Sequence, residues 1–338
     1  MPEALSSWLH SLPLALVGNI AQVLFYPIDP VQRVYWLYLL SSGVFALFAW
    51  RARRRSGEGG GFWRFCFPRE VWSHPSAWLD VRYFLVHQTV FRVWLYGALV
   101  VSISLATATL LLGPGLDARA TPASALERAV LTLAAIALVD LTGFLSHVLQ
   151  HRIPWLWEFH RVHHSPPVLH PLSNYREHPV DNLLYAVGNG AALGTATSGA
   201  AVALGCPLAT VDVLGVNSVL FAFDFLGYHL RHSHIWVRWP CWLEQLLGSP
   251  AYHQIHHSVD PRHRDRNFAF IFPIWDRLLG TQVLPREPET LTFGLGDGTE
   301  AEYDSIFKLY ALPFARLARG RRADVLSPAS CESRPSPS

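Results

Sequence analysis

Long apolar runs, rather than a regular alternation of apolar and polar positions, dominate the first two thirds of the chain. A helix that crosses a bilayer needs about 20 mostly apolar residues, and five runs approach or exceed that length. These runs are residues 34–50, 93–113, 129–149, 182–205 and 208–230. The last two are separated at Pro207 and are expected to form a helical hairpin. An earlier run at 12–28 is interrupted by Asn19, Gln22 and two prolines, which leaves a span, a re-entrant segment and an interfacial helix all open.

The composition is that of a membrane protein. Apolar residues make up 51% of the chain and charged residues only 15%, whereas soluble domains carry about 25% charged residues. The formal net charge of +2 gives no reason to expect a nucleic-acid partner. The predicted fold is therefore all-α, a multi-pass transmembrane helical bundle.

Arginines set the predicted topology. The sequence RARRR at 51–55 directly follows the first run, and loops rich in Lys and Arg stay in the cytoplasm. When the later spans alternate from this starting point, every histidine-rich segment falls on the cytoplasmic side. Arg119 and Arg128 lie in a predicted outer loop, against the rule. The N-terminus has no basic region with a cleavage site, so no removed signal peptide is expected.

Most of the 17 histidines occur in short clusters that follow the apolar runs. The clusters read HVLQH at 147–151, HRVHH at 160–164, HP at 178–179, YHLRHSH at 228–234 and HQIHH at 253–257. Spacings of three and four place side chains on one face of a helix. Neutral imidazole is the commonest protein ligand for metals and suits Fe, Zn, Cu and Ni. Eight to ten imidazoles exceed what one metal takes, so the clusters predict two metals in one site.

The stretch from about residue 140 to residue 281 resembles the sterol desaturase/fatty acid hydroxylase superfamily of integral-membrane di-iron enzymes. The pattern of that superfamily, HxxxH followed by two HxxHH boxes, appears here in order as HVLQH, HRVHH and HQIHH. REHPVD at 176–181, RHSHI at 231–235 and DRNFAFIFPIWDRLLGT at 265–281 are further features of this kind. Two departures are His234, where relatives more often have Asn, and Asn267-Phe268-Ala269 in place of NYG.

The resemblance implies a set of ten metal ligands, eight from the three boxes and two from neighbouring segments. The set is His147, His151, His160, His163, His164, His178, His232, His253, His256 and His257. Histidines that match no box are expected not to bind metal, namely His10, His74, His87, His170, His229 and His263. Candidates for the hydrogen bonds that orient ligand imidazoles are Asp140, Asp224, Asp265 and Asn267. Asp140 lies inside an apolar run and is equally compatible with a structural contact between helices.

The resemblance also implies a reaction and its cofactors. The expected function is oxidation of a C–H bond of a sterol, fatty acyl or related lipid by O2 at two iron ions, with hydroxylation and desaturation both open. Side chains alone cannot carry this chemistry. No CxxCH, flavin fingerprint or ferredoxin cysteine set occurs in the sequence, so electrons are expected from a separate cytochrome- or ferredoxin-type donor. The HPVD element favours sterol or isoprenoid-like substrates slightly. Zinc as the native metal remains open on ligand chemistry alone.

Two other functions are alternatives for a membrane chain rich in histidine. A histidine-rich membrane metal-binding or transport protein predicts ligands within the spans, along a pathway, and a bis-histidine haem protein predicts single histidines on facing helices. Here the histidines are dense and mostly follow the spans. The expected organisation is N-terminal membrane helices and a linker at 1–125, the catalytic domain at 126–285, and a C-terminal extension with a disordered tail at 286–338.

Overall fold

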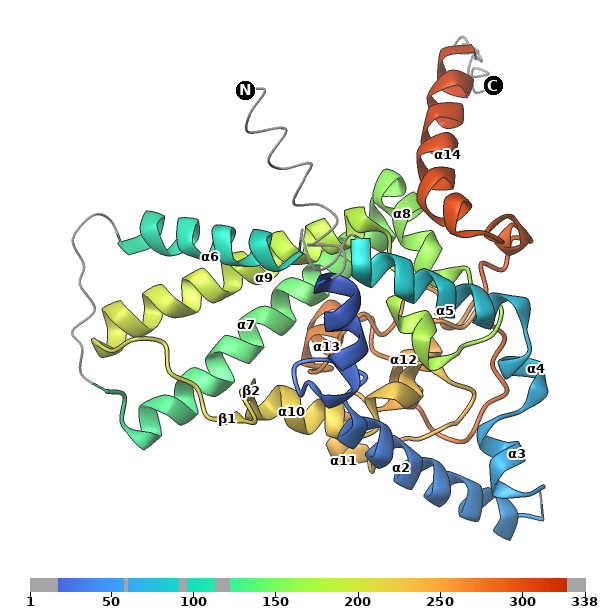
Figure 1. The fold of residues 1–338 in the computed structure, drawn as a ribbon, viewed down its shortest axis with the longest axis horizontal. Coiled ribbons are helices and arrows are strands. Elements are labelled where there is room, and N and C mark those ends of the chain that lie inside the picture. Colours follow the sequence, from blue (N-terminus) through green and yellow to red (C-terminus); the bar gives the residue numbers. More distant parts are fainter. Residues whose placement is uncertain (1–17, 58–59, 91–95, 113–121, 327–338) are drawn as a thin grey trace, which may run out of the picture.

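The computed structural model describes residues 18–57, 60–90, 96–112 and 122–326, and helices dominate it (Figure 1). Residues 18–25 are helical. The elements that follow are η1 (Tyr26–Ile28), α2 (Trp36–Arg55), α3 (Phe62–Cys66), α4 (Arg69–Trp72), α5 (Pro75–His87), α6 (Gly97–Leu112), α7 (Ala125–Arg152), α8 (Pro154–His164), η3 (Pro171–Tyr175), α9 (Pro179–Gly199), η4 (Ala200–Leu204), β1 (Asp212–Val213), β2 (Val216–Asn217), α10 (Ser218–Phe225), η5 (Tyr228–His232), α11 (Cys241–Glu244), α12 (Pro250–His256), α13 (Ile274–Leu279), η6 (Glu300–Glu302) and α14 (Ile306–Leu326). The mostly helical fold predicted from the sequence is confirmed.

Three helices lie side by side on one side of the molecule, and most of the other helices lie on the opposite side (Figure 1). In Figure 1, α6, α7 and α9 run side by side, and α8, η3, η5 and α12 gather around one end of them. Helices α2 to α4 lie along a further edge, and α14 projects away from the rest. The sheet is a single antiparallel pair, in which Asp212 lies opposite Asn217 and Val213 opposite Val216.

Helix α7 connects the apolar part to the histidine-rich part. It begins at a capping box, in which Ser124 Oγ accepts from Glu127 N and a Glu127 carboxylate oxygen accepts from Ser124 N, a pairing that satisfies two backbone donors at a helix start. Among the described residues, α7 is the helix that is both long and apolar enough to cross a membrane. Its last turns carry His147 and His151.

Four of the five predicted spans are helical over their described residues. The run at 34–50 lies in α2, that at 129–149 in α7, and that at 182–205 in α9 and the π-helical turn η4. The run at 93–113 contains α6, which has 16 residues; residues 93–95 and 113 of that run, and residues 12–17 of the earlier one, lie outside the described residues.

The predicted span at 208–230 is wrong. This segment contains β1 and β2, the eight-residue helix α10 and the start of η5. Gly215 and Gly227 have φ of 78° and 79°, a left-handed conformation that ends a regular helix. The Asn217 side chain accepts from Val219 N and starts α10 anew. The run is apolar, as a span requires, but a continuous helix cannot pass through these two glycines.

Two glycines four residues apart allow α9 to approach α6 closely. A Cβ atom at Gly194 would lie 2.6 Å from both Ser104 O and Thr107 Cβ, and one at Gly190 would lie 2.8 Å from Ile103 Cβ. Small residues at this spacing let helix backbones pack closely in membrane proteins. The small-residue content of the 182–205 run therefore has a packing reason.

Gly194→Val is expected to destabilise the protein by about 1–3 kcal/mol, because the added side chain overlaps the α6 backbone. The matched control is Gly199→Val in the last turn of the same helix, since a Cβ at Gly199 meets nothing within 4 Å. Thermal unfolding of the two variants in the same detergent measures the difference. A melting temperature for Gly194→Val equal to that of the control would refute the packing argument.

Candidate metal centre

Nine of the ten histidines predicted to bind metal converge in two groups. Group one is His147, His151, His160, His164 and His256, and group two is His163, His232, His253 and His257. Within each group the candidate ligand nitrogens all lie within 4.8 Å of one another. These side chains come from α7, α8, η5 and α12, which are separated by up to about a hundred residues of sequence.

The helices α8 and α12 each supply both groups. Pro154 at the start of α8 follows directly after the end of α7, and proline is favoured at this position of a helix. In α8, His160 and His164 are four residues apart and join group one, whereas His163 joins group two. The box at the end of α12 divides in the opposite way, with His256 in group one and His253 and His257 in group two. The two groups therefore lie side by side.

The nitrogens in these groups face one another rather than protein hydrogen-bond partners. His164 Nε2 lies 3.1 Å from His256 Nε2, and His253 Nε2 lies 2.9 Å from His232 Nε2. The Nε2 atoms of His147, His151 and His160 are buried and have no hydrogen-bond partner among the described residues. A buried polar atom without a partner costs about 1–3 kcal/mol. Cations placed among these lone pairs would remove that cost, so the donor set fits metal binding.

Burial keeps the imidazoles neutral. It lowers the pKa of His163 and of His256 to about 3, and it lowers the pKa of His164, His253 and His257 well below the ordinary value. Neutral imidazole is the form that coordinates metal. At neutral pH these side chains therefore offer lone pairs without prior loss of a proton.

In several of the grouped histidines, the ring nitrogen that faces away from the group donates a hydrogen bond to an acceptor. Nδ1 of His147 donates to Phe268 O and Nδ1 of His256 donates to Arg266 O, each at 2.8 Å. A carbonyl oxygen only accepts, so these rings carry their proton on Nδ1 and leave Nε2 free for a metal.

Two further grouped histidines are oriented by side chains. His151 Nδ1 lies 3.3 Å from Asp265 Oδ1. His232 Nδ1 lies 3.1 Å from Ser173 Oγ, whose own proton goes to His170 O at 2.7 Å, so the serine oxygen accepts from His232. Asp181 also lies near the site, with Oδ2 at 3.7 Å from His160 Nδ1.

Of the four predicted orienting residues, Asp265 contacts the imidazole of His151, and no hydrogen bond joins the other three to a grouped histidine among the described residues. Asp140 accepts from Ile271 N, Phe272 N and the Trp275 indole N–H at 2.9–3.0 Å, so it fixes a loop to α7 rather than an imidazole. The amide of Asn267 contacts Tyr252 O and both backbone groups of Val283. Asp224 is buried, and no hydrogen bond joins it to a ligand imidazole among the described residues.

The sequence reasoning missed Asp276. Its carboxylate is fully buried and accepts from Phe268 N at 2.9 Å, Ala269 N at 2.7 Å and Tyr252 Oη at 2.9 Å. The backbone carbonyl of Phe268 orients His147, and Tyr252 directly precedes His253 in the sequence. Asp276 therefore holds two residues that lie next to the grouped histidines. An acidic residue in the apolar stretch FPIWDRLLG was the available signal.

His178 lies outside both groups. Its Nδ1 accepts from Val180 N at the start of α9, and its Nε2 donates to Tyr310 O in α14, both at 3.1 Å. With both nitrogens used in this way, His178 connects α9 to α14, and it is left out of the ligand set that we propose. His170 and His229 also have structural roles, since His170 Nδ1 accepts from Leu172 N and His229 Nε2 donates to Arg33 O.

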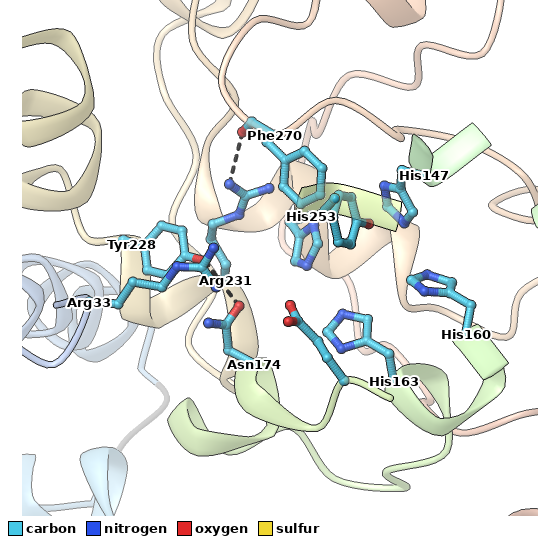
Figure 2. Close-up of a pocket in the computed structure, with 11 residues that line it drawn as sticks. Arg33, His147, His160, His163, Asn174, Tyr228, Arg231, His253 and Phe270 are labelled. Atoms are coloured by element: carbon cyan, nitrogen blue, oxygen red, sulfur yellow. Dashed lines mark hydrogen bonds between the residues drawn. The ribbon is translucent and has the colours of Figure 1, made fainter. Parts of the chain in front are cut away.

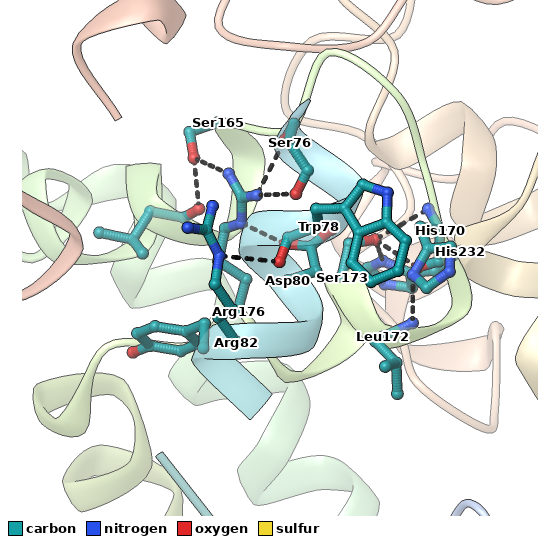
Figure 3. Close-up of polar contacts among 12 residues, drawn as sticks. Ser76, Trp78, Asp80, Arg82, Ser165, His170, Leu172, Ser173, Arg176 and His232 are labelled. Carbon is teal, nitrogen blue, oxygen red and sulfur yellow. Dashed lines mark hydrogen bonds and ion pairs between the residues drawn. The ribbon is translucent and has the colours of Figure 1, made fainter. Parts of the chain in front are cut away.

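A buried ion pair supports the segment between the second box and α9. Arg176 is 1% exposed and its Nε lies 2.5 Å from Asp80 Oδ1 in α5 (Figure 3). Its other donors reach Ser76 O, Ser76 Oγ and Ser165 Oγ at 2.8–3.2 Å. Burial raises the pKa of Asp80 to about 6 although Arg176 acts to lower it, so the carboxyl is mostly ionised at neutral pH. Arg176 thereby holds α5 against the chain that follows His163 and His164.

The histidines border two cavities on different sides. The cavity in Figure 2 has a volume of about 20 Å³ and brings together residues of both groups with polar side chains, which is room for about one water molecule. It is lined by His147, His160, His163, His253, Arg33, Asn174, Glu177, Tyr185, Tyr228, Arg231 and Phe270. The second cavity, of about 270 Å³, borders His151, His164, His256 and His257 together with Trp157, Arg264 and Asp265.

The grouped histidines all lie in a segment that matches a known protein family. Residues 132–281 match the fatty acid hydroxylase family model. The chain is 31% identical to human cholesterol 25-hydroxylase over 151 residues, which cover 43% of this chain and 48% of that protein. It is 28% identical to alkylglycerol monooxygenase of Danio rerio over 161 residues, 46% of this chain and 31% of that protein. It is also 28% identical to the ornithine lipid hydroxylase OlsE of Rhizobium tropici over 184 residues, 54% of this chain and 50% of that protein.

The matched region thus spans half or less of each of these relatives. No solved structure matches the chain significantly.

Proposed function

We propose that this protein is a membrane-bound, di-iron, O2-dependent lipid hydroxylase of the sterol desaturase/fatty acid hydroxylase superfamily, because residues 132–281 match the fatty acid hydroxylase family model and relatives of this kind. The relatives named above are hydroxylases and a monooxygenase, which favours hydroxylation over desaturation. The observation that carries the proposal is the pair of buried histidine groups, in which several Nε2 atoms face one another and those of His147, His151 and His160 have no hydrogen-bond partner among the described residues.

The nine grouped histidines hold the two metals in this proposal. Five nitrogens on one side and four on the other fit two ions rather than one, and imidazole is a suitable ligand for iron. When bound, the irons supply the O2 redox chemistry that side chains lack. Phe268 O, Arg266 O, Asp265 and Ser173 keep Nε2 of their histidines directed at the ions.

In this proposal the protein keeps the metals buried and gives the lipid, electrons and protons separate routes to them. One oxygen atom enters a C–H bond of the lipid to form an alcohol, and the other leaves as water with two electrons from an external one-electron donor and two protons from solvent. The small cavity in Figure 2 borders histidines of both groups, and we propose that the reacting carbon approaches there. The larger cavity, of about 270 Å³, borders Arg264 and Asp265, and we propose that electrons and protons arrive from that side. The topology predicted from the sequence places the histidine-rich segments in the cytoplasm.

Metal analysis and a spectrum of the purified protein test this function. We expect about two irons per chain and no Soret band, together with O2-dependent formation of an alcohol from a lipid in the membrane fraction. Lipid profiles of a deletion strain and its parent would identify the class of substrate, with sterols, alkylglycerols and ornithine lipids as the first to compare. A Soret band would instead support a haem protein. Purified protein that contains zinc in place of iron and forms no oxidation product would overturn the proposal.

Asp265→Ala is expected to weaken iron binding by about 10- to 100-fold, because the residue that fixes the His151 ring is lost. The matched control is Asp260→Ala, since Asp260 lies in the same segment but pairs with the exposed Arg262. Iron retained after dialysis against a graded chelator series measures the effect. Equal iron retention in the two variants would show that Asp265 does not orient a ligand.

A further inference from the structure

A large apolar cavity lies on the side of η5 that faces away from the histidine groups. It has a volume of about 480 Å³, is open to the outside, and is lined by residues of α2, α3, α4 and the segments 169–171 and 229–235. Ligand cavities of about 300–1,000 Å³ are typical for small molecules. None of the nine grouped histidines lines it. Leu230 and Ser233 do line it, and His232 of group two lies between them in the sequence. The segment 230–233 therefore borders both this cavity and the candidate metal centre.

The polar side chains around this cavity are largely satisfied by the protein itself. Ser233 Oγ donates to Leu230 O, His234 Nε2 contacts Phe65 O at 2.7 Å, and His229 Nε2 donates to Arg33 O. The hydroxyl of Ser42 is the exception, since it has no hydrogen-bond partner among the described residues. The cavity therefore offers mostly hydrocarbon surface, which suits an alkyl chain and not a charged or sugar-like ligand.

The residues at the rim indicate where such a ligand comes from. Leu40, Trp63 and Phe67 are 58%, 72% and 48% exposed, although they belong to the lining of the cavity. Contiguous exposed apolar side chains of this kind mark contact with a membrane or an apolar partner. At Gly43, in the middle of the α2 face, an added Cβ meets nothing within 4 Å, so the space beside this helix is open.

We propose that this cavity binds the hydrocarbon chain of a membrane lipid that is not the substrate. The lipid enters from the bilayer past the exposed apolar rim and fills the space between α2 and α3. Because η5 separates it from the metals, the chain is not oxidised there. It instead supports the face of η5 opposite to Tyr228 and Arg231, which border the small cavity at the histidines (Figure 2).

A photoreactive fatty acid tests the proposal in membranes that contain the full-length protein. Palmitic acid bearing a diazirine and an alkyne would be irradiated with and without excess palmitic acid, and the labelled peptides mapped. We expect competable labelling of α2 and of Phe62–Cys66. Gly43→Trp fills the cavity and should reduce this labelling at least fivefold, with Gly43→Leu giving an intermediate loss. Phe48→Trp, at an exposed position of α2 that does not line the cavity, should leave it unchanged.

Two results would overturn the proposal. One is equal competable labelling in Gly43→Trp, Gly43→Leu and Phe48→Trp, which would place the lipid elsewhere. The other is a change in the position at which substrate is oxidised in the Gly43 variants, which would make the cavity part of the substrate site. Bound metal is expected to be the same in all three variants, and because labelling does not depend on turnover, it separates this proposal from the proposed hydroxylase activity.

Discussion

His163→Ala and His256→Ala are each expected to abolish lipid oxidation and to lower the bound iron. His163 belongs to group two and His256 to group one, so each substitution removes one ligand from a different metal. Loss of a residue that merely orients a ligand costs about 10- to 100-fold in affinity or activity, and loss of the ligand itself should cost more. Elemental analysis of purified protein, together with product formation in membranes, measures both effects.

The controls for these variants are histidines that are buried but lie outside both groups. His263→Ala and His178→Ala should retain iron, since His263 lies near Glu289 and His178 contacts Val180 and Tyr310. His178→Ala should nevertheless lower the melting temperature, because it connects α9 to α14. Full iron and full turnover in both the His163 and His256 variants would show that the ligand assignment is wrong.

Asp80→Ala is expected to lower the free energy of unfolding by about 3–5 kcal/mol, because it leaves the Arg176 guanidinium buried without its counter-charge. Arg176 is 1% exposed, and its remaining partners, Ser76 and Ser165, are neutral. A change of this size is a large part of the total stability of a typical protein. Thermal unfolding in detergent, with iron content measured on the same samples, reports the effect.

Two companion variants distinguish the effect of the lost charge on stability from the effect of the lost packing. Asp80→Asn keeps an acceptor for Arg176 and should cost less than Asp80→Ala. Combining Asp80→Ala with Arg176→Met removes both charges, and stability should partly recover, since an apolar replacement of a buried ion pair is often tolerated. If the free energy of unfolding of Asp80→Ala lies within about 1 kcal/mol of that of the parent protein, the ion pair is not needed to hold α5 against η3.

The histidine boxes could be recognised because their chemistry is encoded by local spacing. Histidines four residues apart at the end of α7, and the HxxHH pattern in α8 and at the end of α12, place imidazoles on one side of a helix in any fold that keeps those helices. The apolar run at 129–149 likewise predicted α7 well. Prediction failed at 208–230, where the positive φ angles of Gly215 and Gly227 divide an apolar run into a hairpin and short helices.

The sequence by itself predicted the type of chemistry, the mostly helical fold and the nine grouped histidines, because these depend on residue type and on spacings within one helix. Tertiary structure alone decided that α8 and α12 each divide their histidines between two groups, and that His178 binds backbone rather than joining them. It also revealed the buried carboxylates of Asp276 and Asp80, whose partners are 5 to 96 residues away in sequence. The contact between Asp80 and Arg176 arises only when distant segments pack together, and no local pattern in the chain specifies it.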